Sequence, residues 1–337
     1  MQLLQAILLK LLNTENKMNI VCATDNNFVQ HCSIMLSSLL SHNSNVVIYV
    51  LTEGLTKENE KIIKEEVATL GGKLNICLVD PEIVSKFPMP KDNSLVHISR
   101  ATYYRLLLAD LLPEEVQKVI YLDCDMIIRS SLDELWNTDL TSYALGAVLQ
   151  IGSGFEAERL GYPVSDGYFN AGMNVINLDY FRRNKISSKL VQYLSDHYSE
   201  VIYHDQDALN AVLHDKTVHL APKWNMMTFC YAYELDKRCD HYNEVVINNY
   251  TEEKQNVRKY KNNPCIIHYS ANPKPWQSGC IHPLASLYFE YAKNTIYFNK
   301  AIAPSDITRY YEIFKHRIKE WLSSIKQRFV KTDRTRY

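Results

Sequence analysis

Hydrophobic and polar positions along the chain fall into blocks that predict strands and helices in alternation. Short apolar runs at residues 19–23, 46–51 and 73–80 have the length and composition of buried strands. Between them, apolar residues at 29–40 and at 56–72 recur at the spacing of one helical face, and two glycines end the second helix. Strands that alternate with helices of this length indicate a parallel sheet with helices on both faces.

The same pattern continues into the middle of the chain. The pattern predicts a helix at residues 99–113 and the next buried strand at residues 118–123. Neither an internal repeat nor a low-complexity linker interrupts the sequence as far as Pro283. We therefore predict one α/β domain over residues 18–300, whose first strand opens at Met18.

Residues 1–17 precede this domain and form a separate apolar segment. Its apolar part is shorter than a membrane-spanning helix, which needs about 20 residues. It also lacks the basic start and the small-residue cleavage site of a secretory signal. We interpret residues 1–17 either as an appended helix or as an over-called start of the chain.

Residues 301–337 form a basic tail with an apolar stripe. Nine Lys or Arg and three acidic residues lie between Arg309 and Tyr337. The stripe has helical spacing and consists of Phe314, Ile318, Trp321, Leu322, Ile325 and Phe329. A basic amphipathic helix of this kind is typical of segments that bind anionic membrane surfaces, and it is equally compatible with a helix that docks on the domain.

Composition and charge narrow the class of protein. The 337 residues are 46% hydrophobic and 22% charged, with a formal net charge of -1, which is typical of globular proteins. A near-neutral chain is a poor candidate for general nucleic-acid binding. The eight cysteines include no CxxC pair, which indicates reduced thiols and a cytoplasmic protein.

Two aspartates stand at the end of the strand predicted at 118–123, in the sequence YLDCD. Residues two apart on an extended chain point to the same side, so Asp123 and Asp125 can converge beyond the strand, where open α/β sheets bind ligands. Paired carboxylates repel each other unless a cation lies beside them, and Mn²⁺ or Mg²⁺ accepts such oxygens while keeping positions for phosphate. The pair therefore either holds a divalent cation that carries a phosphorylated ligand or caps the following turn.

An Asp-x-Asp motif after a buried strand also occurs in phosphatases of the haloacid dehalogenase type, where the first aspartate is a nucleophile. There the motif normally lies in the first strand, whereas at least three predicted strands precede it here. No later Gly-Asp-x-x-x-Asp sequence completes the metal site of such a phosphatase. These differences disfavour the phosphatase interpretation.

Four further motifs accompany the aspartate pair in a fixed order. They are CATDNNF at 22–28, FNAGMNVINLDYF at 169–181, HDQDALN at 204–210 and HYSANPKPW at 268–276. Together with YLDCD, this set closely resembles glycosyltransferase family 8, over roughly residues 18–295. That family has the GT-A fold, an α/β fold with a mixed, mainly parallel sheet, and it includes bacterial lipopolysaccharide galactosyl- and glucosyltransferases and glycogenin.

The resemblance implies a cation site and a diphosphate site. Asp123, Asp125 and His268 would be the ligands of Mn²⁺, or of Mg²⁺ in its place, and the UDP diphosphate would complete the shell. Lys274 would bind the diphosphate. The last motif departs from the family form, His-x-x-Gly-x-x-Lys-Pro-Trp, because Ala271 replaces the glycine, which puts the usual backbone contact to the diphosphate in question.

The resemblance also implies a binding site for the nucleotide base in CATDNNF. Asp25 would accept a hydrogen bond from the uracil imide, Ala23 and Asn27 would add polar contacts, and Phe28 would stack on the ring. The alternative is a structural loop in which the aspartate makes an Asx turn and Phe28 lies in the core.

Six residues would surround the donor sugar, again by resemblance: Arg105, Asn170, Ala171, Gly172, Asp205 and Gln206. Arg105 would lie near the sugar and phosphate, and the small residues Ala171 and Gly172 would let the sugar approach the backbone. Asp205 and Gln206 would be the catalytic residues: Asp205 would bind sugar hydroxyls, and Gln206 would lie near the anomeric carbon. Because an amide is a poor nucleophile, we expect front-side attack by the acceptor hydroxyl in place of a covalent intermediate.

The implied activity is that of a retaining glycosyltransferase that moves galactose or glucose from a UDP-sugar to a glycan or glycolipid acceptor, in the synthesis of lipopolysaccharide or another surface polysaccharide. The alternative is a catalytically silent partner protein that binds UDP-sugar, although such a protein has no chemical need for the complete set of site residues. We expect a cytoplasmic protein, peripheral on the inner face of the cytoplasmic membrane if the basic tail binds there.

Overall fold

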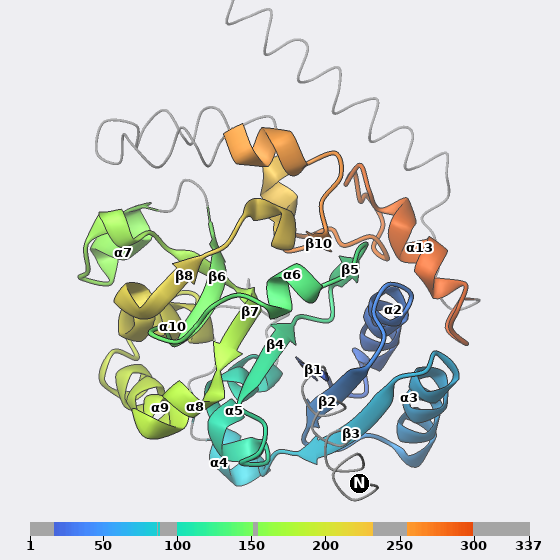
Figure 1. Cartoon of the computed structure of the whole chain (residues 1–337), viewed down its shortest axis with the longest axis horizontal. Coiled ribbons are helices and arrows are strands. Elements are labelled where there is room, and N and C mark those ends of the chain that lie inside the picture. Colours follow the sequence, from blue (N-terminus) through green and yellow to red (C-terminus); the bar gives the residue numbers. More distant parts are fainter. Residues whose placement is uncertain (1–16, 86, 88–99, 151–153, 232–254, 299–337) are drawn as a thin grey trace, which may run out of the picture.

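The computed structural model describes residues 17–85, 87, 100–150, 154–231 and 255–298 (Figure 1). The appended segment predicted at the start of the chain therefore lies, apart from Lys17, outside the described residues. The basic amphipathic tail predicted at 301–337 lies outside them entirely. Among the residues that are described, no helix is both long enough and apolar enough to cross a membrane.

A seven-stranded sheet forms the centre of the molecule. Its strands are β1 (Met18–Ala23), β2 (Val46–Thr52), β3 (Lys73–Leu78), β4 (Lys118–Leu122), β6 (Leu145–Leu149), β7 (Phe169–Asn177) and β8 (Thr217–His219). Their order is β3-β2-β1-β4-β7-β6-β8. Within this sheet β7 runs antiparallel to both neighbours and the other described pairings are parallel. The prediction of a mixed, mainly parallel sheet is confirmed.

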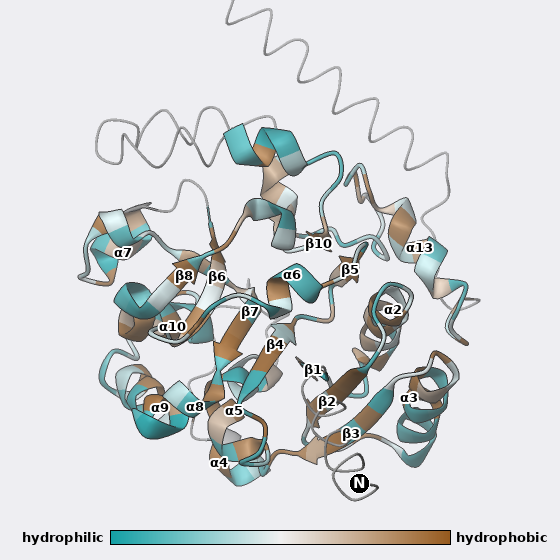
Figure 2. Cartoon of the chain, in the orientation of Figure 1, coloured by the Kyte–Doolittle hydropathy of each residue, from teal (hydrophilic) through white to brown (hydrophobic). Residues whose placement is uncertain are grey.

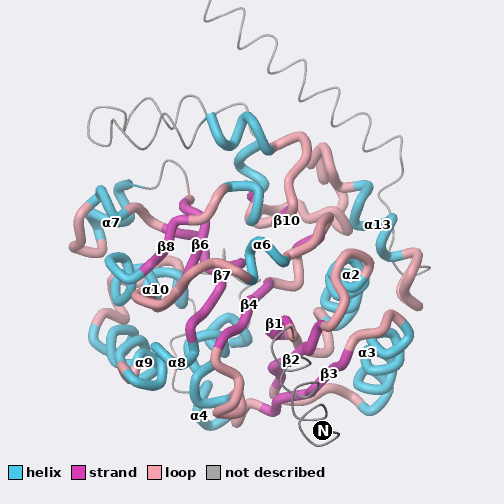
Figure 3. Tube along the Cα trace, in the orientation of Figure 1, coloured by secondary structure: helices cyan, strands magenta, loops and turns pink. Residues whose placement is uncertain are grey.

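Helices surround the sheet (Figure 3). The described α-helices are α2 (Val29–Leu40), α3 (Lys57–Thr69), α4 (Pro81–Ser85), α5 (Leu108–Leu111), α6 (Asp133–Trp136), α7 (Gly154–Arg159), α8 (Leu178–Arg183), α9 (Ile186–Asp196), α10 (His204–Leu213) and α13 (Ser286–Ala292). The 3₁₀-helices are η2 (Arg100–Leu107), η3 (Val164–Asp166), η4 (His214–Lys216), η5 (Pro222–Trp224) and η6 (Thr228–Tyr231). The helices predicted between the first three strands are confirmed as α2 and α3.

The continuous helix predicted at residues 99–113 is wrong in type. The chain instead forms the 3₁₀-helix η2 followed by the single turn of α5. A 3₁₀-helix has three residues per turn, so residues i and i+3 lie on the same side. Thr102 and Arg105, three residues apart, both contact Asp205, through Oγ1 and Nε respectively. Tertiary contacts of polar residues therefore override the local helical pattern.

Alternate residues of the central strands enter two separate apolar cores. In β4, Ile120 and Leu122 face one core together with α2 and α3, whereas Val119 and Tyr121 face the other together with η2, α8, α9 and α10. Figure 2 shows that the residues of β2 and β7 are mostly hydrophobic, whereas those of α3 are largely hydrophilic. The sheet is thus covered on both faces, as its apolar runs predict.

A second sheet of three short strands lies against the first core. It has the order β5-β10-β9, with β5 (Met126–Ile128), β10 (Ile266–His268) and β9 (Met226–Met227). His268 pairs with Met126 of the antiparallel strand β5 and with Met227 of the parallel strand β9. The residues that directly precede β5 and β9, Asp125 and Asn225, are therefore brought to the two sides of His268.

The reversed direction of β7 brings a third segment to the same place. Parallel strands β1 and β4 end at one edge of the main sheet, whereas the antiparallel strand β7 begins there. Leu122 pairs with Met173, and the backbone N–H of Asp123 donates to the carbonyl of Gly172 at 2.9 Å. The start of β7 therefore adjoins the aspartate pair that follows β4.

Candidate active site

The loop between β4 and β5 brings the two aspartates to His268 of β10. One ligand atom from each of Asp123, Asp125 and His268 can be chosen so that all three lie within 4.8 Å of one another. The side chain of His268 is almost fully buried and that of Asp125 is largely buried, whereas Asp123 is more accessible. The structure thus brings the aspartate pair together with His268, which lies more than a hundred positions later in the sequence.

The carboxylate of Asp125 has an oxygen that fits a cation. Asp125 Oδ1 is buried and has no hydrogen-bond partner within the described part of the chain, although His268 Nε2 lies 3.3 Å away. A buried carboxylate oxygen without a partner is costly. Two carboxylates and an imidazole form a donor set that suits Mn²⁺, and also Mg²⁺ at lower preference because of the nitrogen ligand. The residues present therefore fit a divalent cation.

Lys274 adds positive charge to the other oxygen of Asp125. Its Nζ donates to Asp125 Oδ2 at 2.6 Å and also to the backbone carbonyl of Tyr269. Burial raises the pKa of the Asp125 carboxyl, but Lys274 and then His268 outweigh it and hold that pKa well below its usual range. Asp125 is therefore a carboxylate at neutral pH, in contact with the amine predicted to bind diphosphate.

Arg105 is a buried bridge between two carboxylates. Its Nη2 donates to Asp123 Oδ1 and its Nε lies against Asp205 Oδ2, both at 2.8 Å, while Nη1 donates to the carbonyl of Ala171. The guanidinium also lies 4.3 Å above the ring of Tyr121, and only 5% of its surface is exposed. Burial raises the pKa of Asp123, and Arg105 opposes that rise. The contact of Arg105 with a donor sugar stays a prediction.

Asp205 is held by groups of the protein itself. Its Oδ1 accepts from the hydroxyl of Thr102 at 2.6 Å, and its Oδ2 pairs with Arg105. Each oxygen keeps a further lone pair, so the predicted contact with sugar hydroxyls stays open to test. Asp205 also orients Arg105, and through it Asp123, which the sequence did not indicate.

Gln206 is fixed against the start of β7. Its Oε1 accepts from Asn170 Nδ2 and from the backbone N–H of Ala171, each at 3.0 Å, and its Nε2 donates to Gln150 Oε1 at 3.4 Å. The structure therefore groups Gln206 with two of the residues predicted to contact the donor sugar. Its position relative to an anomeric carbon stays a prediction.

The last aspartate of HDQD has a structural role. Asp207 is fully buried, and its Oδ1 accepts from Arg159 at 2.8 Å and from the hydroxyl of Tyr168 at 2.7 Å. Its Oδ2 accepts from the backbone N–H groups of Ile202 and Tyr203. These bonds secure the first turn of α10, which carries Asp205 and Gln206.

Gly172 is packed against two of the predicted cation ligands. A Cβ at this position would lie 2.5 Å from His268 Cε1, 2.8 Å from Asp123 Oδ2 and 3.0 Å from Asn170 Oδ1. Any side chain would therefore push His268 and Asp123 away. The approach of a sugar to this glycine stays a prediction. The close packing against His268 and Asp123 is a second reason why this position requires glycine.

The loop after β1 combines features of both sequence interpretations. Asp25 Oδ1 accepts from the backbone N–H groups of Asn27 and Phe28 at 2.8 and 2.9 Å, which is an Asx turn. Phe28, however, lies outside the core: 37% of its surface is exposed, and its ring makes edge contacts with His31 and Trp276. The uracil contacts predicted for Ala23, Asp25, Asn27 and Phe28 stay predictions.

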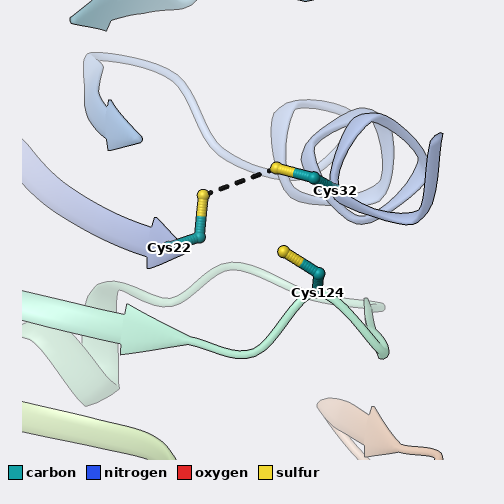
Figure 4. Close-up of side chains that lie close together, drawn as sticks. All are labelled: Cys22, Cys32 and Cys124. Carbon is teal, nitrogen blue, oxygen red and sulfur yellow. Dashed lines mark hydrogen bonds between the residues drawn. The ribbon is translucent and has the colours of Figure 1, made fainter. Parts of the chain in front are cut away.

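Cys124, which lies between Asp123 and Asp125, bonds to Ala23 at the end of β1. Its Sγ donates to the carbonyl of Ala23 at 3.1 Å, and it faces Cys22 and Cys32, whose sulfur atoms lie 3.6 Å apart (Figure 4). The three thiols are buried within 4.8 Å of one another. Cys22, Cys32, Cys77, Cys124 and Cys265 form no disulfide bond, and Cys239 lies outside the described residues.

Asn225 is a site residue that motif analysis missed. It is completely buried between the predicted cation site and the start of β7, where its side chain bonds to both His268 and Asn170. The sequence feature that could have indicated it is an asparagine between the apolar residues Trp224 and Met226, because a buried amide needs specific partners.

Comparison with known proteins identifies relatives along most of the chain. The model of glycosyl transferase family 8 matches residues 19–280. General stress protein A of Bacillus subtilis is 30% identical over 288 residues, which are 82% of this chain and 94% of that protein. The lipopolysaccharide 1,3-galactosyltransferase of Salmonella typhimurium is 27% identical, over 83% of this chain and 78% of that protein. The lipopolysaccharide glucosyltransferase WaaO of Escherichia coli is 25% identical, over 91% and 87%.

Two solved structures of one enzyme have the same fold. The galactosyltransferase LgtC in complex with donor and acceptor sugar analogs matches with a TM-score of 0.73 and 26% identity, over 86% of this chain and 98% of that chain. An active-site mutant of LgtC, in which a glutamine is replaced by glutamate, matches with a TM-score of 0.72 and the same identity.

Proposed function

The chain belongs to glycosyltransferase family 8 and has the GT-A fold of a glycosyltransferase, and we propose that it transfers galactose or glucose from a UDP-sugar to an acceptor hydroxyl with retention of configuration. The observation that carries the proposal is the cluster of Asp123, Asp125 and His268, which includes the buried, unpartnered oxygen Oδ1 of Asp125. Lys274 beside it suits a ligand that combines a cation with a diphosphate.

The proposed reaction first requires stabilisation of the negative charge that develops on the departing diphosphate. Asp123, Asp125 and His268 would hold Mn²⁺, or Mg²⁺ in its place, and a cation bound there would supply Lewis-acid stabilisation of the leaving group. Lys274 would stabilise the same charge directly. Arg105 acts on this site by holding the carboxylate of Asp123 in place.

The reaction also requires stabilisation of the positive charge that develops on the sugar. Gln206 would lie near the anomeric carbon, and both lone pairs of its Oε1 are engaged by Asn170 and Ala171. An amide oxygen is a poor nucleophile, and its partial negative charge would instead stabilise the oxocarbenium-like carbon electrostatically. The acceptor hydroxyl would attack from the side of the leaving group and pass its proton to the departing phosphate. The active-site glutamine replaced in LgtC is compatible with this role.

The choice of sugar and acceptor rests on the relatives. They include a galactosyltransferase and a glucosyltransferase of lipopolysaccharide, so we infer a hexose donor and a glycan or glycolipid acceptor in a surface polysaccharide. The acceptor of the protein would be reached at the cytoplasmic face of the membrane if the tail at 301–337 binds there.

The alternative is a partner protein that binds UDP-sugar without turnover. The test is release of UDP from UDP-galactose and UDP-glucose with Mn²⁺, with and without acceptor, followed by NMR of the anomeric configuration of the product. Metal-dependent turnover with retention supports the proposal. Tight binding of UDP-sugar with no turnover under any acceptor would support the partner protein, and an inverted product would exclude the retaining mechanism.

A further inference from the structure

Two backbone amides fix the orientation of the side-chain amides around the site. The N–H of Ala171 donates to Gln206 Oε1, and the N–H of Gly172 donates to Asn170 Oδ1, both at 3.0 Å. A backbone N–H can only donate, so the atom that faces it must be the oxygen of the side-chain amide. The other terminal atom of Asn170 is then its NH₂ group, and it donates to Gln206 Oε1 at 3.0 Å.

The same logic extends to His268. Asn170 Oδ1 also accepts from Asn225 Nδ2 at 2.9 Å, so the remaining atom of the Asn225 amide is its oxygen. Asn225 Oδ1 lies 2.9 Å from His268 Nδ1. Because this oxygen can only accept, Nδ1 must carry the proton, and the neutral ring has its lone pair on Nε2.

A competing force acts on the other side of the ring. The carboxylate of Asp125 lies 3.3 Å from Nε2 and would favour a proton there, because a charged acceptor binds an N–H more strongly than an amide oxygen does. A proton on Nε2 would block that nitrogen as a cation ligand. The amide of Asn225 opposes this tautomer, and Asn225 is itself fixed by Asn170 and completely buried.

We propose that Asn225 is a positioning residue that holds His268 in the tautomer with a free Nε2, and that couples this ring through Asn170 to Gln206. The part of the inference that concerns cation affinity rests on the proposed function of Asp123, Asp125 and His268. The chain of bonds from His268 to Gln206 means that one residue influences both the cation site and the predicted sugar site.

Nitrogen-15 NMR of histidine in the full chain, without added cation, tests the tautomer directly. The two nitrogen shifts report which ring nitrogen carries the proton, and the His268→Gln variant identifies the signal. We expect a protonated Nδ1 and an unprotonated Nε2 in the wild type. The opposite tautomer in the wild type would overturn the inference without any variant.

Two substitutions separate the two bonds of Asn225. Asn225→Leu removes both, so the proton should move to Nε2 and the affinity for Mn²⁺ should fall by about 10- to 100-fold. Asn225→Asp keeps an acceptor for Nδ1–H but cannot donate to Asn170. That variant should therefore keep the tautomer and bind Mn²⁺ within a few-fold of wild type, while its turnover falls.

Asn174→Leu is the matched control, since Asn174 is equally buried on β7 and donates to the backbone carbonyls of Met173 and Asn170. It should leave the tautomer of His268 unchanged. An unchanged tautomer in Asn225→Leu, or the same tautomer shift in the Asn174 control, would refute the role of Asn225. A wild type with the expected tautomer that nevertheless does not bind Mn²⁺ would refute the proposed cation site and leave the positioning role of Asn225 standing.

Discussion

The amine of Lys274 lies 2.6 Å from Asp125 Oδ2, so the residue predicted to bind diphosphate touches a residue predicted to bind the cation. A cation that approaches Asp125 must share this carboxylate with a positive charge. The positive charges of Lys274 and of a bound cation therefore repel each other, and a bound diphosphate would offset this repulsion.

Replacement of Lys274 should separate these functions. In Lys274→Met the repulsion is lost, so Mn²⁺ alone should bind several-fold more tightly, whereas UDP should bind more weakly and turnover should fall. Isothermal titration with Mn²⁺, and with UDP in the presence of Mn²⁺, measures both effects. Weaker binding of Mn²⁺ alone would mean that Lys274 helps to assemble the cation site.

Removal of the cation or of its central ligand should abolish transfer. Asp125→Asn lacks the negative charge that would balance a divalent ion, so Mn²⁺ affinity and transfer activity should both fall by at least two orders of magnitude. The exposed Asp179, paired with Arg183 on α8, offers the control Asp179→Asn, which should behave as wild type. Full activity of the wild-type protein in EDTA would contradict the proposed mechanism.

A methyl group on Gly172 should damage the site with little change elsewhere. In Gly172→Ala the new Cβ would overlap His268 Cε1, so the ring must move, and Mn²⁺ affinity should fall by about 10- to 100-fold. Overpacking of this kind typically costs about 1–3 kcal/mol of unfolding free energy. Titration with Mn²⁺ and urea unfolding measure the two quantities.

Gly146→Ala is the matched control, because its Cβ would meet only the flexible end of Leu220, at 3.3 Å. This variant of strand β6 should keep wild-type Mn²⁺ affinity. Equal losses in both variants would indicate a general effect of alanine in the sheet and no specific pressure on His268.

Gln206 should affect the chemical step more than binding. Gln206→Ala removes the partial negative charge from the predicted position of the anomeric carbon, so kcat should fall by about two to three orders of magnitude. UDP affinity should stay within a few-fold, because UDP lacks the sugar. Steady-state kinetics and titration with UDP provide the comparison, and near-normal turnover would remove Gln206 from the reaction.

His31 should give the folded state a dependence on acid pH. Its ring is buried, stacks on Trp276 at 3.8 Å and bonds to the hydroxyl of Tyr288, and burial lowers its pKa to about 4. The unfolded chain, with the ordinary histidine pKa of about 6.5, binds a proton that the folded protein does not take up between these values. Stability should therefore fall as pH drops from about 6.5 to 4, by up to about 3 kcal/mol from this group.

The variant His31→Gln removes this titration while keeping a polar group that can reach Tyr288. The unfolding free energy, measured in urea at several pH values between 4 and 7, should decline less steeply in the variant than in the wild type. Parallel curves for the two proteins would mean that His31 contributes nothing to the pH dependence.

The sequence was sufficient to predict a mainly parallel sheet and the position of the aspartate pair after one of its strands, whereas the strand order and the three-stranded sheet were not predicted. Buried strands such as β2 and β4 are continuous apolar runs, and ligands of open α/β sheets gather at the ends of such strands. The convergence of His268 on Asp123 and Asp125 was expected from the resemblance to a family and not from the local pattern.

The contacts among polar residues could not be predicted from local patterns. Arg105 of the 3₁₀-helix η2 contacts Asp123 and Asp205, which lie far along the chain, so no local pattern indicates these partners. Asn225 acquires its role only when β9 pairs with β10, about forty residues later in the chain. Periodicity describes which residues are buried, whereas these bonds depend on which strands meet.

The three-stranded sheet has a consequence for how this protein can change. Successive side chains of a strand point to opposite faces, so a slip of β10 by a single residue would turn the imidazole of His268 away and present Ile267 in its place. Insertions and deletions near residues 266–268 should therefore disrupt the site far more than conservative substitutions there. The number of residues in this segment is therefore as important for the position of the imidazole as the identity of His268.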